Sequence, residues 1–229
     1  MPIIQDNEFG KITIRRNPQS RHIRIRVAPD STLRVSAPPY TPMFLIKRMV
    51  ASSRDQLRAM LKTQAPELTY TSGSEIGKSH SLLVREGSSI KVERHGLQIV
   101  LTLPATSSLS DPEAQAQLRE QVIAALRREA KGYLPKRLKY LAESHGFSYA
   151  KVRFSHASGR WGSCSSNGTI SLNIALMKLP FELIDYVLIH ELAHTRHMDH
   201  SSAFWDVVNQ YDPSYKKHRS LLKQEAPTI

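Results

Sequence analysis

Residues 190–200 read HELAHTRHMDH, so four of the ten histidines in this 229-residue chain lie together within eleven positions. On an α-helix, residues four apart lie one turn above each other on the same face. His190 and His194 therefore present two imidazoles side by side, with Glu191 at their flank. This H-E-x-x-H arrangement is typical of a catalytic zinc site, with two histidine ligands and a glutamate that acts as general base on a metal-bound water.

The third metal ligand has three candidates further along the chain: His197, His200 and Asp206. His197 follows His194 by three residues, and three ligands stacked along one helix face do not converge on one ion. His200 lies far enough along for the chain to leave the helix and turn back, and polar residues at 199–202 suit that bend. The spacing favours His200 and equals that of the metzincin signature, although His197 stands where that signature has glycine.

The residues before the motif predict that a buried helix carries it. Pro180 suits the start of a helix, and the stretch FELIDYVLIHELAHTRH places Leu183, Val187, Leu188 and Leu192 in an apolar run. We therefore expect a helix over 181–197 that packs against a core and holds the histidines at its C-terminal end.

The loop and strand upstream of this helix are candidates for a substrate cleft. Arg160 and Trp161 lie in the loop GRWGSCSSNG, where ordinary packing is the alternative role for Trp161. Residues 169–179 alternate apolar and polar side chains, which predicts a strand able to pair with an extended peptide. A donor for the transition-state oxyanion is also needed near the metal. Three downstream side chains are candidates that the sequence does not rank: Tyr211, Tyr215 and His218.

The N-terminal sequence predicts a sheet with arginines on its exposed face. In RHIRIRV, apolar residues alternate with Arg24 and Arg26, which is the period of a strand with one buried face. KITIRR and TLRVSAP show similar patterns, and Asp30-Ser31 suits a hairpin turn. We expect a helix from about Pro42 to Leu61 and then further strands with turns at Gly87 and Gly96.

The composition changes near residue 105, where a helical pattern begins. Ser110 is the expected N-cap of this helix, and Gly132 and Pro135 are expected to interrupt it before a second helical stretch ends at Gly146. The sequence thus predicts two parts of an α+β protein: a strand-rich basic N-terminal region with one helix over 1–105 and a zincin-like metalloprotease domain over 106–229.

The chain is strongly basic, with a formal charge of +12 and a pI near 10.0. Residues 1–60 hold eleven lysines and arginines against four acids. Basic proteins attract polyanions, of which nucleic acid is the commonest. The N-terminal surface is therefore a candidate DNA-binding surface, and a charged face that keeps the protein soluble is the alternative.

The cysteine content and the lengths of the apolar runs indicate in which cellular compartment the protein is expected. Cys164 is the single cysteine, which excludes an internal disulfide and suits a reducing compartment. This thiol is expected to be a small buried side chain rather than a fourth, inhibitory zinc ligand. The N-terminus does not resemble a secretory signal, and no apolar run approaches the length of a membrane span. We expect a cytoplasmic protein without membrane association.

Three stretches together resemble a known family. HELAHTRHMDHSSAFW, preceded by RWGSCSSNGTISLN and LPFELIDYV, is similar to the YgjP-like metallopeptidases, which are related to the SprT/Spartan group of zincins. The resemblance implies a peptidase with one catalytic zinc, ligands at His190, His194 and His200, and the base at Glu191. The SprT/Spartan relatives act on proteins bound or crosslinked to DNA, which is compatible with the basic surface.

The sequence therefore predicts a zinc-dependent metallopeptidase that hydrolyses peptide bonds in peptides or proteins, with DNA-associated proteins as candidate substrates. The alternative is a nucleic-acid-binding module with a structural or vestigial metal site. A closed structural site needs a fourth protein ligand, and the presence of Glu191 favours catalysis. Neither the physiological substrate nor the oligomeric state follows from these residues.

Overall fold

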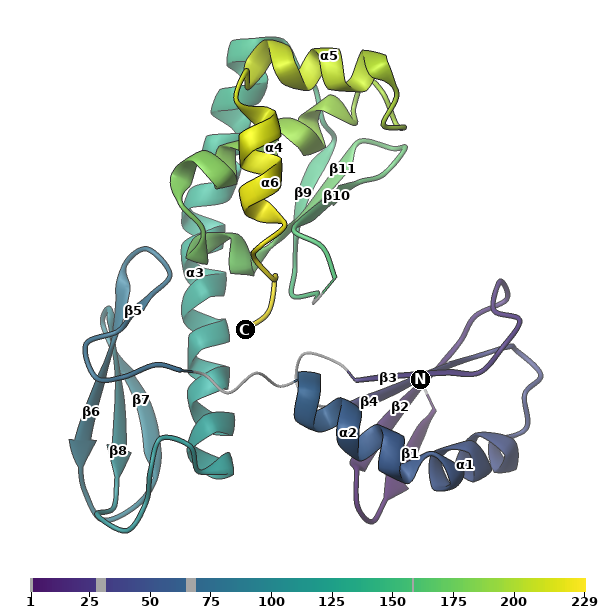
Figure 1. Cartoon of the computed structure of the whole chain (residues 1–229), viewed down its shortest axis with the longest axis vertical. Helices are drawn as coiled ribbons and strands as arrows, with labels where there is room; N and C mark the ends of the chain where they lie inside the picture. Colours follow the sequence, from purple (N-terminus) through teal and green to yellow (C-terminus); the bar gives the residue numbers. More distant parts are fainter. Residues whose placement is uncertain (1, 28–31, 65–68, 158) are drawn as a thin grey trace. The chain divides into compact units, whose positions relative to one another are not determined.

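The computed structural model describes residues 2–27, 32–64, 69–157 and 159–229. It divides into two compact units, Met1–Pro66 and Glu67–Ile229 (Figure 1). Each unit has its own apolar core, and each combines strands with helices. The predicted α+β class is therefore confirmed.

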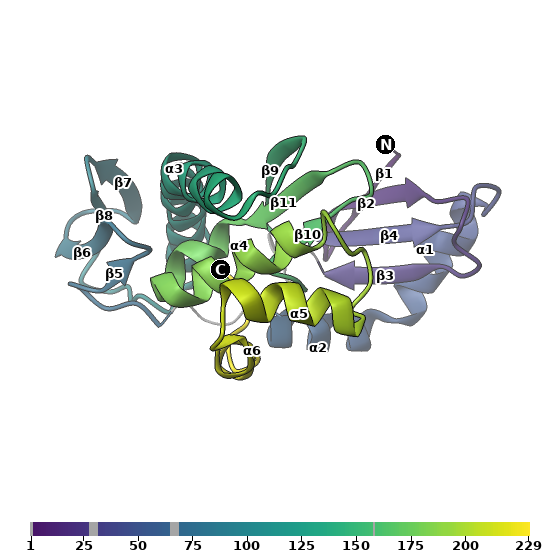
Figure 2. The same ribbon diagram turned by 90° about the horizontal axis from the view of Figure 1, so that it is seen from above.

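The first unit is a four-stranded sheet with two helices packed on one face (Figure 2). Its strands are β1 (Ile3–Asp6), β2 (Gly10–Arg16), β3 (Arg24–Val27) and β4 (Leu33–Ala37), in the spatial order β1-β2-β4-β3. Its helices are α1 (Met43–Ser52) and α2 (Arg54–Gln64). Ile46, Val50 and Leu57 of the helices join the buried side chains of the sheet in one core.

The predicted alternation in this unit is confirmed, whereas its helix differs from the expectation. Ile12 and Ile14 of β2 are buried between exposed Lys11 and Arg15. One helix was expected from 42 to 61, but the chain forms two, with the break at Ser53. The predicted turn at Asp30-Ser31 lies outside the described residues.

The second unit begins with a small sheet that packs on a long helix. Its strands are β5 (Glu75–Ile76), β6 (His80–Glu86), β7 (Lys91–His95) and β8 (Gln98–Leu103), and the helix is α3 (Pro112–His145). Leu82 and Leu101 of the sheet share a core with Leu118 and Leu126 of α3. Because this packing joins the sheet to α3, the division in the structure differs from the boundary predicted near residue 105.

Helix α3 is continuous over 34 residues, so the prediction that it stops near Gly132 and Pro135 is wrong. Buried leucines before and after Pro135 hold both halves against the core, which outweighs the lost backbone hydrogen bond. The N-cap is Asp111 rather than Ser110, and Gly146 ends the helix in the left-handed conformation as predicted. Within the described ranges, none of the helices combines the length and apolarity that a membrane crossing requires.

The remaining elements form a second sheet flanked by three helices (Figure 1). The strands are β9 (Lys151–Ser155), β10 (Gly162–Cys164) and β11 (Thr169–Asn173), in the order β10-β11-β9. A short 3₁₀ helix, η1 (Ile174–Lys178), leads to α4 (Phe181–Ala193), α5 (Ser202–Tyr211) and α6 (Tyr215–Leu222). The strand predicted over 169–179 thus ends at Asn173, whose side chain caps η1 by accepting a hydrogen bond from Ala175 N.

Candidate active site

The three histidines favoured by the sequence come together at the C-terminal end of α4. This helix ends at Ala193, four residues earlier than expected, and the chain turns away immediately after His194. The turn brings His200 back to the pair before α5 begins. One ring nitrogen from each of His190, His194 and His200 lies within 4.8 Å of the other two.

The spacing of these nitrogens fits a single small cation. Nε2 of His190 and Nε2 of His200 are 3.2 Å apart. Two ligand nitrogens of a tetrahedral zinc, each with a bond of about 2.0–2.1 Å, lie roughly 3.3 Å apart. The donor set of three imidazoles also suits zinc and leaves a fourth position open.

The ring of His194 is oriented by a backbone contact. Its Nδ1 lies 3.1 Å from the carbonyl oxygen of His197 and donates to it when it carries the proton. That tautomer leaves Nε2 of His194 free to bind a metal, which is the usual arrangement around ligating histidines. His197 thus meets the site through its carbonyl. Within the described residues, His197, Cys164 and Asp206 do not join the group of candidate ligand atoms.

Burial keeps the paired histidines neutral. Desolvation, together with the nearby His194 and His200, lowers the pKa of His190 to about 3. The pKa of His194 is also lowered, mainly by burial. Metal ions bind the neutral form of imidazole, so these rings are in the ligand form at neutral pH.

Glu191 is buried beside the histidines and packs against a glycine. Glu191 is only 5% exposed. Burial raises the pKa of its carboxyl group to about 8, although the positive charge of Arg160 opposes this effect. A methyl group at Gly162 would lie 2.5 Å from Oε1 of Glu191 and 2.8 Å from its Cδ. Because glycine has no side chain, Gly162 leaves room for the carboxyl group of Glu191 beside β10.

Two aromatic side chains of α5 support the histidines. The buried ring of Phe204 lies 4.9 Å from that of His190, 4.5 Å from His194 and 4.8 Å from His200, measured between centroids. Trp205 stacks on His200 at 5.7 Å. Phe204 thus forms an apolar floor under all three rings, and Trp205 restrains the exposed His200.

A cavity of about 460 Å³ opens over these residues. Arg160, Gly162 and Cys164 line it together with Glu191 and the three histidines. The expectation that Arg160 borders the cleft is therefore confirmed, whereas Trp161 packs against the core. Tyr211, Tyr215 and His218, the candidate oxyanion donors, are not among the described residues that line this cavity.

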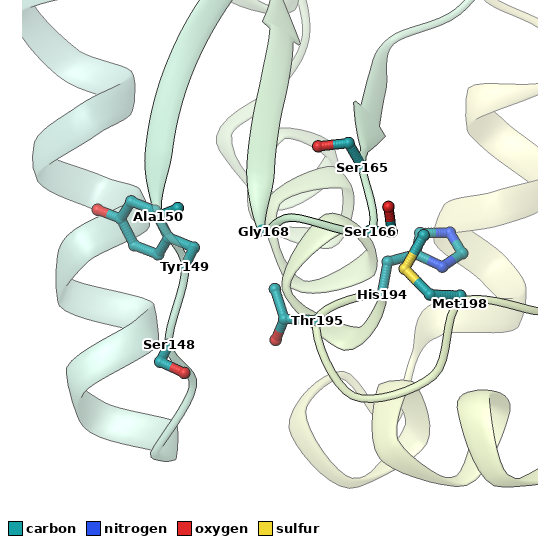
Figure 3. Close-up of a pocket in the computed structure, with 9 residues that line it drawn as sticks. All are labelled: Ser148, Tyr149, Ala150, Ser165, Ser166, Gly168, His194, Thr195 and Met198. Carbon is teal, nitrogen blue, oxygen red and sulfur yellow. The ribbon is translucent and has the colours of Figure 1, made fainter.

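A second cavity of about 300 Å³ has His194 and Met198 in common with the first (Figure 3). Its other lining residues come from the segment just before β9, the turn between β10 and β11, and the turn after α4. They are small or uncharged: Ser148, Tyr149, Ala150, Ser165, Ser166, Gly168 and Thr195. The two cavities therefore meet at His194 and Met198.

Strand β11 was expected to offer its edge to a peptide, but this expectation is wrong. β11 pairs with β10 on one side and with β9 on the other, so both of its edges are occupied. Among the described strands, β10 pairs only with β11, and Gly162 at its start contacts Glu191. The strand edge nearest the candidate base therefore belongs to β10.

Sequence reasoning missed Gly162, Asn173, Phe204 and Trp205. All four lie within the stretches RWGSCSSNGTISLN and HELAHTRHMDHSSAFW, but their roles depend on contacts between distant segments. The pattern that could have pointed to Phe204 is its place one turn into the helix that follows His200, on that helix's apolar face.

The sequence model of a family described as YgjP-like, metallopeptidase domain, matches residues 21–225. The chain is similar to the solved metallopeptidase zymogen of Pyrococcus abyssi abylysin, with 29% identity and a TM-score of 0.37 over 42% of this chain and 98% of that one. It is also similar to the zymogen of Methanocaldococcus jannaschii jannalysin, with 18% identity and a TM-score of 0.36 over 39% and 93%. The search of curated proteins gave no match.

Proposed function

The chain belongs to the YgjP-like metallopeptidase family, and we propose that it is a zinc-dependent peptidase with His190, His194 and His200 as the metal ligands. The observation that carries this assignment is the convergence of the three ring nitrogens within 4.8 Å. The pair of Nε2 atoms 3.2 Å apart supports zinc as the ion, because that spacing matches two ligands of a tetrahedral centre.

Glu191 is the proposed general base. It borders the same cavity as the three histidines and is absent from the group of candidate ligand atoms. Burial raises the pKa of Glu191 to about 8, so its carboxylate is a stronger base than that of an exposed glutamate. Its contact with Gly162 fixes the carboxyl group at the edge of β10.

The reaction follows from these positions. Zinc bound here would lower the pKa of a coordinated water and polarise the substrate carbonyl. Glu191 accepts the proton of the attacking water at its carboxylate and delivers it to the nitrogen of the leaving amine. The free edge of β10 aligns an extended peptide by backbone hydrogen bonds, so that the chain runs past Glu191.

A structural metal site in a binding module is the alternative. Structural zinc sites are closed by four protein ligands, whereas the described residues supply three here. The cavity over the cluster and the buried carboxyl group beside it also favour catalysis.

Replacing Glu191 with glutamine tests the assignment of the base. Glu191→Gln keeps the size of the side chain but removes its ability to accept a proton, so we expect zinc content near wild type and no detectable hydrolysis. Elemental analysis and cleavage of casein or a fluorogenic peptide measure the two properties. Loss of zinc, or full activity, in this variant would be incompatible with the proposed role.

We also propose that the first unit binds DNA or a similar polyanion through the open face of its sheet, which brings the peptidase to DNA-associated proteins. Arg24 and Arg26 of β3 are exposed on the face opposite the helices, as are Lys11 and Arg15 of β2. The described acids of this unit lie elsewhere: Asp6, Glu8 and Asp55 pair with Arg54 and Arg58 of α2.

Salt dependence tests this binding surface. If Arg24 and Arg26 neutralise phosphates, binding of duplex DNA should weaken steeply with salt, and the double variant to serine should reduce the log–log slope by about 1 to 2. The matched control replaces Arg127 and Arg128, which are exposed on α3, with serine. Absence of DNA binding at low salt, or equal slopes in the two double variants, would contradict the proposal.

A further inference from the structure

Arg160 is the strongly basic side chain on the wall of the cavity that holds the candidate metal ligands. It is exposed, and its positive charge acts on Glu191, where it opposes the effect of burial. Arg160 therefore borders the same cavity as Glu191 and the three histidines, where it can meet a substrate bound over them.

The backbone of Arg160 is fixed by a buried side chain. Asn173 is fully buried, and its Nδ2 donates to the carbonyl of Arg160 at 3.0 Å and to that of Ala157 at 2.7 Å. The backbone amide of Asn173 also donates to the carbonyl of Trp161 at 2.8 Å. The end of β11 thus holds the Arg160 backbone in place, so the loop presents this side chain from a fixed point.

Two other arginines of this unit, Arg137 and Arg196, hydrogen-bond to groups of the protein itself. Arg137 makes two hydrogen bonds with the carboxylate of Asp185, at 2.8 and 2.6 Å. Arg196 donates to the carbonyls of His145 and Gly146. Among the described residues, no carboxylate lies within ion-pair distance of Arg160. An exposed guanidinium without such a partner, carried on a fixed backbone beside the cavity, is available to a carboxylate that arrives with the substrate.

We infer that Arg160 is a specificity residue that binds a carboxylate of the substrate, and this inference rests on the proposed peptidase function. Such a carboxylate has two sources: an aspartate or glutamate near the scissile bond, or the C-terminus of a short peptide. The second cavity shares His194 and Met198 with the first, but its described lining has no lysine, arginine or carboxylate, so a permanently positive side chain borders only the first cavity. The cleft thus selects a substrate with negative charge on the Arg160 side.

Matched peptides test the inference. Fluorogenic peptides blocked at both ends carry glutamate, glutamine or lysine at each position around the scissile bond, and a second set has a free C-terminal carboxylate. With wild-type enzyme, kcat/KM should favour glutamate over glutamine by about tenfold at one position, or the free C-terminus over the amide by a similar factor. Arg160→Gln should reduce that ratio to near one, and Arg160→Glu should shift the preference to lysine.

Comparing peptides within one variant separates recognition from catalysis. If Arg160 stabilised the transition state instead, Arg160→Gln would slow both peptides equally and leave the ratio unchanged, which would overturn the inference. A wild-type ratio near one at every position would also overturn it. Arg153→Gln is the matched control, because Arg153 is exposed on β9 and lines neither cavity; it should keep the wild-type ratio.

A binding measurement tests carboxylate recognition by Arg160 separately from peptidase activity. Fluorescence anisotropy with the zinc-loaded Glu191→Gln variant reports the affinity for the glutamate and glutamine peptides without turnover. Tighter binding of the glutamate peptide, lost when Arg160→Gln is added, supports the inference even if no peptide is cleaved. Equal affinities would overturn the inference, whereas a failure to cleave any peptide counts against the peptidase function.

Discussion

At the scale of single residues, the candidate site depends on one position without a side chain. Gly162 lies where Glu191 packs against β10, and a methyl group there would approach the carboxyl group to 2.5 Å. Contacts this short require the carboxyl group to move. Because Glu191 is held between this strand and its own helix, the displacement would move the base relative to the histidines.

Gly162→Ala is therefore expected to retain zinc while kcat falls, by about 100-fold if the carboxyl group moves by 1 Å. Gly132→Ala is the matched control, because a methyl group at this exposed helical position meets nothing within 4 Å. Elemental analysis and steady-state kinetics measure both variants. Wild-type kcat in a folded Gly162→Ala enzyme would show that the glycine does not position the base.

The residues that the sequence predicted and those that it missed differ in the distance over which they act. His190, Glu191 and His194 are neighbours on one helix, so helical geometry alone relates them. The contact between Gly162 and Glu191 joins segments about thirty positions apart, and it exists only after β10 packs on α4. The periodicity of apolar residues and the spacing of motif residues in the sequence do not predict the close approach of Gly162 and Glu191.

At the scale of elements, α3 shows how tertiary packing overrides local preference. Pro135 lacks an amide hydrogen and predicts a break, yet the helix continues from Pro112 to His145. Leu134 and Leu138 on either side of the proline are fully buried in the core. Helix propensity therefore predicts the free-energy cost of Pro135 in a helix, but it does not predict the buried packing that offsets this cost.

Pro135→Ala is expected to stabilise the protein. Alanine restores a helical hydrogen bond and removes the clash of the proline ring, a gain of up to about 3 kcal/mol, which the greater freedom of the unfolded chain reduces to about 2 kcal/mol. Urea denaturation followed by circular dichroism measures the change. An unchanged or lower free energy of unfolding would mean that the surrounding core has adapted to the proline.

At the scale of the whole molecule, the chain combines a basic unit with a unit that contains a metallopeptidase cleft. Composition predicted the basic charge of the first unit, and alternation placed its arginines on an exposed face, as β3 confirms. The division between the units was not predictable from composition, because the β5–β8 sheet resembles the first unit in sequence pattern but packs on α3. Only the packing of the β5–β8 sheet on α3 assigns this sheet to the second unit.

The zinc content of two histidine variants tests most directly whether His190, His194 and His200 hold one zinc ion. His200→Ala removes a proposed ligand, so this variant should lose zinc and activity. His197→Ala should keep zinc, because His197 meets the site through its backbone carbonyl, which accepts from Nδ1 of His194. Zinc lost from the His197 variant and kept by the His200 variant would contradict the account.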